Sequence, residues 1–352
     1  MIVTDSDVLL KAEQWTREGR RLALATVVET WGSAPCPAGS HLVVDWNGNF
    51  YGSVSGGCVE AEVIAASEEV IASGIPKLLK FGVKTETAWR AGLACGGHVT
   101  VFLESLIKSD GHALQLSDLA ILNGERRLRH PVVLVTDMET GERRILRERD
   151  FNTDELADEI ARLVTLRRSG LIDWRGRRYF LTVMTPPVKI VIVGAGRISQ
   201  ALAGLASFAG LDIAVIDPRA AFATAERFPG TLIIVDWPDV AFAKLGLDRH
   251  MAVACLTHDR KVDDIALELA LKAECAYVGA LGSRKSHNAR LHRLRTRGLG
   301  EEMLTRIRAP IGLDIGASDA MEIAVSILGE IFLVTRRKPL RESHSFDVTE
   351  AA

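Results

Sequence analysis

Two glycines and a carboxylate, spaced as in a dinucleotide-binding fingerprint, carry the clearest chemistry in this sequence. Gly194 and Gly196 follow the apolar run 189–193, and Asp217 comes about twenty residues further on, the usual spacing for the acid of this motif. Glycines let a phosphate approach the backbone, and the N-terminus of the following helix favours an anion. A carboxylate at Asp217 can bind a ribose diol. The pattern predicts a nucleotide-type phosphate site.

The third position of this fingerprint is Ser199, where glycine or alanine is usual. Serine is still small enough to keep the helix close to the preceding strand, so we include Ser199 among the candidate cofactor-binding residues. An alternative is a glycine-rich turn that binds nothing, since a fold can persist without its ligand.

Later predicted strands end in further polar residues that could reach a ligand. Arg219 follows Asp217, and Ser283 and Arg284 begin a basic helix. Arg284 is predicted to contact a phosphate, assisted by Ser283 and the helix N-terminus. His258 could be a general base, or it could only neighbour the cap of the next helix.

The first half of the chain has glycine loops that carry cysteines. Cys58 follows Ser55, Gly56 and Gly57 and comes just before a predicted helix at 61–73. A helix N-terminus favours a thiolate and attracts anions, which makes Cys58 a candidate ligand contact. The alternative is a small buried cysteine packed under a glycine turn.

A similar loop contains Cys95, Gly96 and Gly97, just before His98. A zinc site from these loops, formed by Cys36, Cys58, Cys95 and His98, lacks any Cys-x-x-Cys pair, so we predict no metal site. Two other cysteines, Cys255 and Cys275, lie in apolar strands and are predicted to be core residues.

The elements that must position these residues fall into two domains. From Pro186-Pro187 onward, apolar runs at 189–193, 213–216, 232–235, 252–256 and 276–278 alternate with helical segments. This pattern predicts a five-stranded parallel sheet with ligands at the carboxyl ends of its strands. Before it, hairpins such as 132–136 with 143–147 and helices such as 153–169 predict a mixed α+β domain. The predicted boundaries are 1–185, 186–338 and a disordered polar tail at 339–352.

Composition restricts the classes of function. The chain has 352 residues, a formal net charge of −2, and 47% hydrophobic and 25% charged residues. These values are typical of a globular protein and give no general attraction to nucleic acid or to a membrane. The N-terminus lacks the features of a signal peptide, no apolar run reaches the length of a membrane span, and the cysteines show no disulfide pattern. A cytoplasmic location is expected.

The motifs together resemble the xanthine dehydrogenase accessory family, XdhC/CoxI. The resemblance is carried in order through both halves by the segments 32–35, 52–60, 92–97, 194–199 with 217–219, 257–259, 279–284, and 310–313 through 322–326. Cys36 stands where the family more often has arginine, and Asp319-Ala320 replaces a proline-containing helix start.

This resemblance implies an N-terminal XdhC/CoxI domain and a C-terminal Rossmann domain. It also implies transient binding of molybdenum cofactor, as molybdopterin or its cytosine dinucleotide form, and insertion of the sulfurated cofactor into a xanthine dehydrogenase-type molybdenum hydroxylase. The expected partners are that apoenzyme and a cysteine desulfurase, and the expected assembly is a homodimer. We hypothesise that the residues around Gly194, Asp217 and Arg284 hold the phosphate or nucleotide end, and that Cys58 and Cys95 face the pterin or metal.

Two other classes of function remain open at this stage. An NAD(P)-dependent oxidoreductase would use the same fold, but His258 has no clear Lys/Tyr or Cys/His companion for hydride transfer. A regulatory or scaffold protein would keep the fold without a ligand. The sequence therefore favours an accessory factor over an enzyme.

Overall fold

The computed structural model describes residues 5–31, 35–82, 98–106 and 114–336. The chain divides into two compact units, Met1–Pro186 (unit 1) and Pro187–Ala352 (unit 2). No helix among the described residues combines the length and the apolar character needed to cross a membrane.

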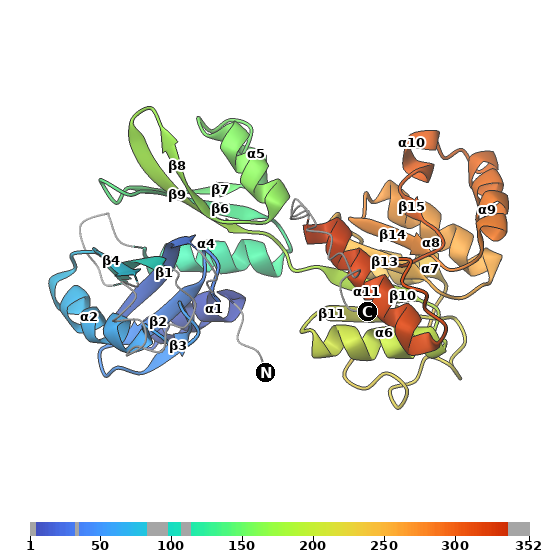
Figure 1. The fold of residues 1–352 in the computed structure, drawn as a ribbon, viewed down its shortest axis with the longest axis horizontal. Helices are drawn as coiled ribbons and strands as arrows, with labels where there is room; N and C mark the ends of the chain where they lie inside the picture. Colours follow the sequence, from blue (N-terminus) through green and yellow to red (C-terminus); the bar gives the residue numbers. More distant parts are fainter. Residues whose placement is uncertain (1–4, 32–34, 83–97, 107–113, 337–352) are drawn as a thin grey trace, which may run out of the picture. The chain divides into compact units, whose positions relative to one another are not determined.

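Unit 1 contains two antiparallel sheets (Figure 1). The first has five strands in the order β3-β2-β1-β5-β4, and the second has four in the order β7-β6-β9-β8. The strands of the first sheet and its helices are α1 (Asp5–Arg17), β1 (Leu22–Trp31), β2 (His41–Asp45), β3 (Phe50–Gly52), α2 (Glu60–Ser73), β4 (Lys77–Gly82) and β5 (His98–Ser105). The second sheet follows with α4 (Leu116–Arg127), β6 (Val132–Asp137), β7 (Arg143–Arg147), η1 (Glu148–Asp150), α5 (Ala157–Leu166), β8 (Gly170–Trp174) and β9 (Arg177–Met184).

Strand β1 is the centre of unit 1 because both of its faces are covered. Ala23, Ala25 and Val27 pack in one cluster with apolar residues of α2. The alternate residues Leu22 and Leu24 pack with α1, α4 and β6. The period-two pattern of a strand thus places α2 on one side of the first sheet and α1 with α4 on the other.

Unit 2 is a parallel sheet of six strands in the order β12-β11-β10-β13-β14-β15. Its elements are β10 (Lys189–Val193), α6 (Arg197–Phe208), β11 (Asp212–Ile216), β12 (Leu232–Ile234), α7 (Pro238–Leu245), β13 (Met251–Cys255), α8 (Arg260–Lys272), β14 (Tyr277–Ala280), α9 (Arg284–Thr296), α10 (Glu301–Leu304), β15 (Ile307–Arg308) and α11 (Ala320–Arg336). Residues Ile190 and Ile192 of β10 pack in the cluster that contains α6 and α11. Val191 and Val193 pack in the cluster that contains α7 and α8, so the sheet is covered on both faces (Figure 1).

The strand order of unit 2 fixes where a ligand should bind. In chain order the strands lie 3-2-1-4-5-6, so the connections leave β10 in one direction and β13 in the other. Open parallel sheets bind ligands outside the carboxyl ends of the strands at such a switch point. The loops that follow β10 and β13 therefore form the candidate site of this unit.

The fold class is confirmed, but several elements differ from the sequence predictions. The parallel sheet has a sixth strand, the two-residue β15, and β4 and α4 were not predicted at all. Helix α5 begins at Ala157 rather than at 153, because the carboxylate of Asp154 accepts hydrogen bonds from Arg144 and from the Leu156 N–H. The predicted tail at 339–352 lies outside the described residues.

Candidate functional site

Gly194 ends β10 in a conformation that favours glycine. Its φ is +105°, and a Cβ at this position would lie 2.7 Å from Cγ2 of Thr257. The backbone of Gly194 is fixed, since its N–H donates to the carbonyl of Ile216 at 2.7 Å. Gly194 therefore lets the loops after β10 and β13 approach closely.

Gly196 is the residue before α6 and has a different environment. Apart from its two chain neighbours, no atom of the described residues lies within 4 Å of the position that a Cβ would take, and none of their side chains forms a capping hydrogen bond with the N-terminus of α6. Because the first N–H groups of a helix have no intrahelical acceptor, this end of α6 can receive an anion. Ser199 is fully buried one turn further along, and its hydroxyl has no hydrogen-bond partner among the residues that the structure describes, so it packs against the core and does not face a ligand.

Asp217 is completely buried at the end of β11. Its carboxylate accepts hydrogen bonds from the Ala195 N–H at 2.7 Å and from Nε and Nη2 of Arg219 at 2.9 and 2.8 Å. Burial alone would raise the pKa of this carboxyl, but the hydrogen bonds from Arg219 and from the Ala195 N–H together outweigh burial and lower the pKa. The polar group that this strand end presents to solvent is thus the half-exposed guanidinium of Arg219, which also lies over the ring of Phe222 at 4.1 Å.

The remaining predicted residues of unit 2 lie at the ends of β13 and β14. His258 is exposed and has a positive φ of 61°, while the next residue, Asp259, caps α8 by accepting a hydrogen bond from the Lys261 N–H at 2.9 Å. Ser283 caps α9, and Arg284 is the exposed first residue of that helix. The strand order brings these loops to the same edge of the sheet as Gly194 and Arg219.

Two buried charged residues, Asp263 and Arg290, hold these loops in place, and the sequence did not reveal them. The hydroxyl of Thr257 donates to Asp263 at 2.7 Å, and Arg290 donates to the carbonyl of Leu281 at 2.8 Å. Asp263 and Arg290 are 4.0 Å apart and both are buried. Their positions inside α8 and α9 resemble those of ordinary surface charges in the sequence, so only the packing of the helices identifies them.

The basic residues further along α9 are neutralised within unit 2. Arg293 pairs with Asp264 at 2.5 Å, Arg295 with Glu301 at 2.5 Å, and Arg297 with Glu268 at 2.6 Å. This arrangement agrees with a solvated, ion-paired helix face.

The glycine loop of unit 1 is organised by Glu60, the first residue of α2. One carboxylate oxygen accepts hydrogen bonds from the Ser53 hydroxyl at 2.6 Å and from the Ser55 N–H at 2.9 Å. The other accepts from the Gly57 N–H at 2.9 Å. Burial would raise the pKa of Glu60, but these hydrogen bonds outweigh it and lower the pKa from 4.5 to about 2. The sequence pattern includes Glu60 in this motif but gives no sign of its role.

The backbone donors of this loop are therefore already engaged. The N–H of Gly56 donates to the Ser53 hydroxyl at 2.8 Å, and the N–H of Cys58 donates to the Ser55 hydroxyl at 2.9 Å. The half-buried thiol of Cys58 packs against the cluster between the first sheet and α2. A contact between this loop and a ligand would involve the Cys58 side chain rather than the N–H groups.

A second loop approaches the first at Pro35 and Cys36. The Cys36 thiol lies 3.7 Å from the Ser53 hydroxyl, and a Cβ on Gly56 would lie 3.2 Å from Pro35. The third predicted loop, with Cys95, Gly96 and Gly97, lies outside the described residues. His98, just after it, stacks on Trp31 with ring centroids 5.8 Å apart. In the part of the chain that the structure describes, no three His, Cys, Asp or Glu side chains are grouped so that they could hold a metal ion.

The predicted core cysteines are confirmed. Cys255 and Cys275 are fully buried. Burial raises the pKa of both thiols, that of Cys275 to about 12.

Comparison with known proteins agrees with this architecture. Residues 15–82 match the model of the "XdhC and CoxI family", and residues 190–331 match that of the "XdhC Rossmann domain". A crystal structure titled a xanthine dehydrogenase from Bacillus halodurans has the same fold, with a TM-score of 0.69 over 97% of this chain and 98% of that one at 23% identity.

Two curated relatives match over most of their length. A protein of Bacillus subtilis named as a probable xanthine dehydrogenase subunit is 27% identical over 89% of this chain and 93% of that protein. "Molybdenum cofactor insertion chaperone PaoD" of Escherichia coli is 31% identical over 92% of this chain and 86% of that protein. With both domain models matched in order and a relative this similar along nearly its whole length, the chain belongs to the XdhC and CoxI family.

Proposed function

We propose that this protein binds molybdenum cofactor as cargo and delivers it to a molybdenum hydroxylase. The observation that carries the proposal is the 31% identity, over 92% of this chain, to a protein named as a molybdenum cofactor insertion chaperone. The relative named as a xanthine dehydrogenase subunit supports a hydroxylase of the xanthine dehydrogenase type as the recipient.

The loops at the carboxyl edge of the unit 2 sheet suit the phosphate end of the cargo. Molybdopterin ends in a phosphate, and its dinucleotide form contains a diphosphate. The uncapped N-terminus of α6 and the open space at Gly196 can receive such an anion. Arg219 and Arg284 add exposed positive charge at the same edge.

Cys58 and Cys95 are proposed to contact the pterin or the metal. The thiol of Cys58 is half-buried in a loop that Glu60 makes rigid. A rigid loop holds a soft sulfur ligand in place without a further change of the backbone. Sulfuration of the cargo by a cysteine desulfurase, and assembly of the chaperone as a homodimer, are parts of the same proposal.

The geometry does not favour the competing oxidoreductase. Both oxygens of Asp217 accept hydrogen bonds from protein groups, so a ribose diol would have to displace Arg219. His258 stands exposed beside a helix cap. We therefore expect no steady turnover of a nicotinamide.

Reconstitution of an apo-hydroxylase tests the proposal. Purified protein loaded with molybdenum cofactor should restore hydroxylase activity faster than free cofactor does. In a separate assay without the hydroxylase, the isolated protein should leave the absorbance of added NAD(P)H constant. If the protein does not change the rate or the yield of reconstitution, the chaperone role is rejected.

Two cysteine variants test separately whether the thiols contact the cofactor. Cys58→Ala and Cys95→Ala should reduce retention of the cofactor after gel filtration, and thermal melting would verify that the variants are folded. Unchanged retention and delivery in both variants would reject the thiol contacts while leaving the chaperone role intact.

A further inference from the structure

His258 has a backbone conformation that its place in the fold does not explain. Five non-glycine residues of the part of the chain that the structure describes have a positive φ. Four of them are at helix ends or in a hairpin turn, where a left-handed residue is common. These are Arg129, Arg167, Arg175 and Glu274. His258, with a φ of 61°, instead lies between β13 and α8 at the carboxyl edge of the sheet.

The left-handed conformation of His258 has an energetic cost that burial does not offset. A residue with a Cβ is strained at a positive φ, although histidine tolerates this region better than most. His258 is exposed, so packing in the core does not compensate for the strain. Strained backbone of this kind is typical of residues that contact a ligand.

Hydrogen bonds on both sides of His258 hold this conformation. The Thr257 hydroxyl accepts a hydrogen bond from the Asp259 N–H at 2.9 Å and donates one to Asp263 at 2.7 Å. Asp259 in turn caps α8 through the Lys261 N–H. The residues before and after His258 are therefore both fixed to α8, and His258 must turn the chain between them.

A buried ion pair extends this support to the next strand. Asp263 and Arg290 are 4.0 Å apart and are 2% and 5% exposed. Arg290 donates to the carbonyl of Leu281 at 2.8 Å, but its buried Nε and Nη1 atoms have no hydrogen-bond partner among the described residues. A buried pair with a long contact and unpaired donors contributes little to stability. Its effect is to join the loop after β13 to the loop after β14.

The loop that carries His258 lies at the switch point of the sheet. A Cβ on Gly194 would lie 3.0 Å from the backbone nitrogen of Thr257. The Leu256 N–H donates to the carbonyl of Val193 at 2.7 Å. This loop is therefore in direct contact with the turn after β10, where open parallel sheets bind their ligands. An exposed imidazole at this place offers an N–H to a phosphate oxygen.

We propose that His258 donates a hydrogen bond to the phosphate end of the cargo. Thr257, Asp263 and Arg290 act through His258 as positioning residues, because they fix the two loops that determine where the imidazole lies. These roles rest on the proposed chaperone function and add a specific contact to it. A histidine that its surroundings hold in place binds without further loss of backbone freedom, which favours affinity.

Equilibrium binding of molybdenum cofactor to the full-length protein tests this contact. Under anaerobic conditions, ultrafiltration separates free from bound cofactor, and the pterin content of each fraction gives the Kd. His258→Gly removes the imidazole and keeps the left-handed backbone, so the Kd should rise roughly tenfold. The melting temperature of unit 2 should rise by about 2 °C in calorimetry, because glycine adopts this conformation without strain. A purely structural role of His258 predicts the opposite change in stability.

Two variants of Thr257 test whether the support acts through His258. Thr257→Val removes the hydroxyl and should raise the Kd roughly fivefold, whereas Thr257→Ser keeps the hydroxyl and should bind within about twofold of the wild type. Adding Thr257→Val to His258→Gly should raise the Kd by no more than about twofold, since the contact that Thr257 positions is already absent. Independent contributions would instead multiply to roughly fiftyfold.

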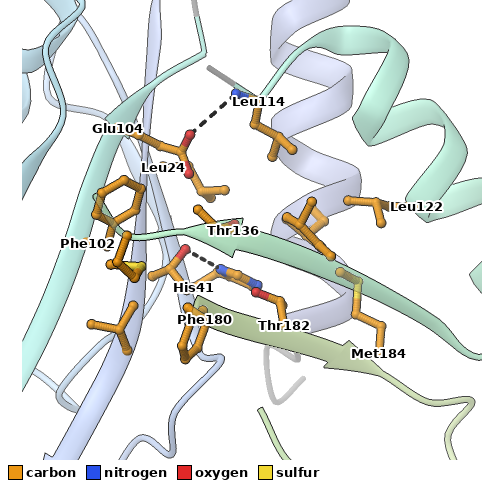
Figure 2. A pocket seen from close by; sticks show the side chains of 15 residues that line it. Leu24, His41, Phe102, Glu104, Leu114, Leu122, Thr136, Phe180, Thr182 and Met184 are labelled. Carbon is orange, nitrogen blue, oxygen red and sulfur yellow. Dashed lines mark hydrogen bonds between the residues drawn. The ribbon is translucent and has the colours of Figure 1, made fainter. Parts of the chain in front are cut away.

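Thr26→Val is the matched control, because it makes the same exchange in unit 1. The buried Thr26 hydroxyl lies 3.0 Å from Nδ1 of His41, beside a cavity of about 20 Å³ between the two sheets of that unit (Figure 2). Its loss should lower the melting temperature of unit 1 and leave the Kd within about twofold of the wild-type value.

The outcomes separate the role of His258 from the chaperone function. If the wild type does not bind molybdenum cofactor, the chaperone function is rejected, and the roles of His258 and Thr257 with it. If the wild type binds and His258→Gly binds equally well, only the contact with His258 is rejected. Multiplied effects in the double variant, or an equal loss of affinity in Thr26→Val, would overturn the positioning role. A loss of affinity in His258→Gly that Thr257→Val does not deepen supports both roles.

Discussion

Two loops of this protein share a strand, glycine loop and helix arrangement but differ in what their backbone donors bind. The loop before α2 directs its N–H groups at Glu60 and at the hydroxyls of Ser53 and Ser55. The loop before α6 uses only Ala195 to bind a carboxylate, that of Asp217, and leaves the helix N-terminus uncapped. An acidic residue at the start of a helix can thus occupy the position that a bound anion would take.

Among the variants that test this difference between the two loops, Glu60→Ala should have the largest effect on stability. Glu60→Ala leaves several buried donors without an acceptor, so we expect the free energy of unfolding of unit 1 to fall by about 3 kcal/mol. Urea titration followed by tryptophan fluorescence measures this change, because every tryptophan except Trp237 lies in unit 1.

Glu62→Ala is the matched control for this variant. Glu62 is exposed in the same first turn of α2, and its loss should change the free energy of unfolding by no more than about 0.5 kcal/mol. Equal effects of the two variants would contradict the role of Glu60 as the internal anion.

The hydrogen bonds to Glu60 also predict that the stability of unit 1 depends on pH. The pKa of Glu60 is lowered in the folded state to about 2 from 4.5, so its contribution to stability is present above pH 4.5 and is lost as the pH falls toward 2. The stability difference between the wild type and Glu60→Gln should therefore shrink over this range. Taking the difference cancels the titration of other carboxyls, such as buried Glu104, whose pKa is raised by burial. A difference that stays constant from pH 5 to about 2.5 would be inconsistent with this assignment.

Gly194 provides a smaller effect in unit 2. In Gly194→Ala the new methyl group would lie 2.7 Å from Thr257, at a φ of +105°. We expect a loss of about 2 kcal/mol in the stability of unit 2, detected by differential scanning calorimetry. Wild-type stability would show that the loops after β10 and β13 can separate without loss of free energy.

The parts of the fold that could be predicted from sequence are those with local signals. The buried run 189–193, the two glycines and Asp217 together predicted β10, the turn, α6 and β11, because period and turn chemistry act over a few residues. Strand β4 was missed because polar and apolar residues do not alternate along it: its half-buried face includes Lys77 and its exposed face includes Leu78. The strand is stabilised by pairing with distant β5.

The interactions within the candidate sites could not be predicted in the same way. A pocket of unit 1, for example, is lined by residues from 37–41, 126, 167–169 and 182–185, which only the tertiary fold brings together. The pairing of Asp217 with Arg219 is local, yet the sequence could not show that it occupies the carboxylate that was predicted to bind a ribose. Competition among hydrogen-bond partners depends on side-chain geometry, which a spacing pattern does not contain.

The last prediction concerns Gly196→Ala, which should affect binding more than stability. Gly196 has a φ of −80°, which alanine adopts readily, and open space at the Cβ position. Alanine is a poorer N-cap than glycine, so we expect the stability of unit 2 to fall by up to about 1 kcal/mol. Cofactor retention should fall as well, beyond what this small loss of stability explains, because the methyl group occupies the approach of the phosphate. Gly204→Ala on the exposed face of the same helix is the control, and should raise stability by up to about 1 kcal/mol while leaving retention unchanged. If Gly196→Ala retains the cofactor as the wild type does, the open end of α6 is not the phosphate site, and the difference between the two glycine loops would concern folding alone.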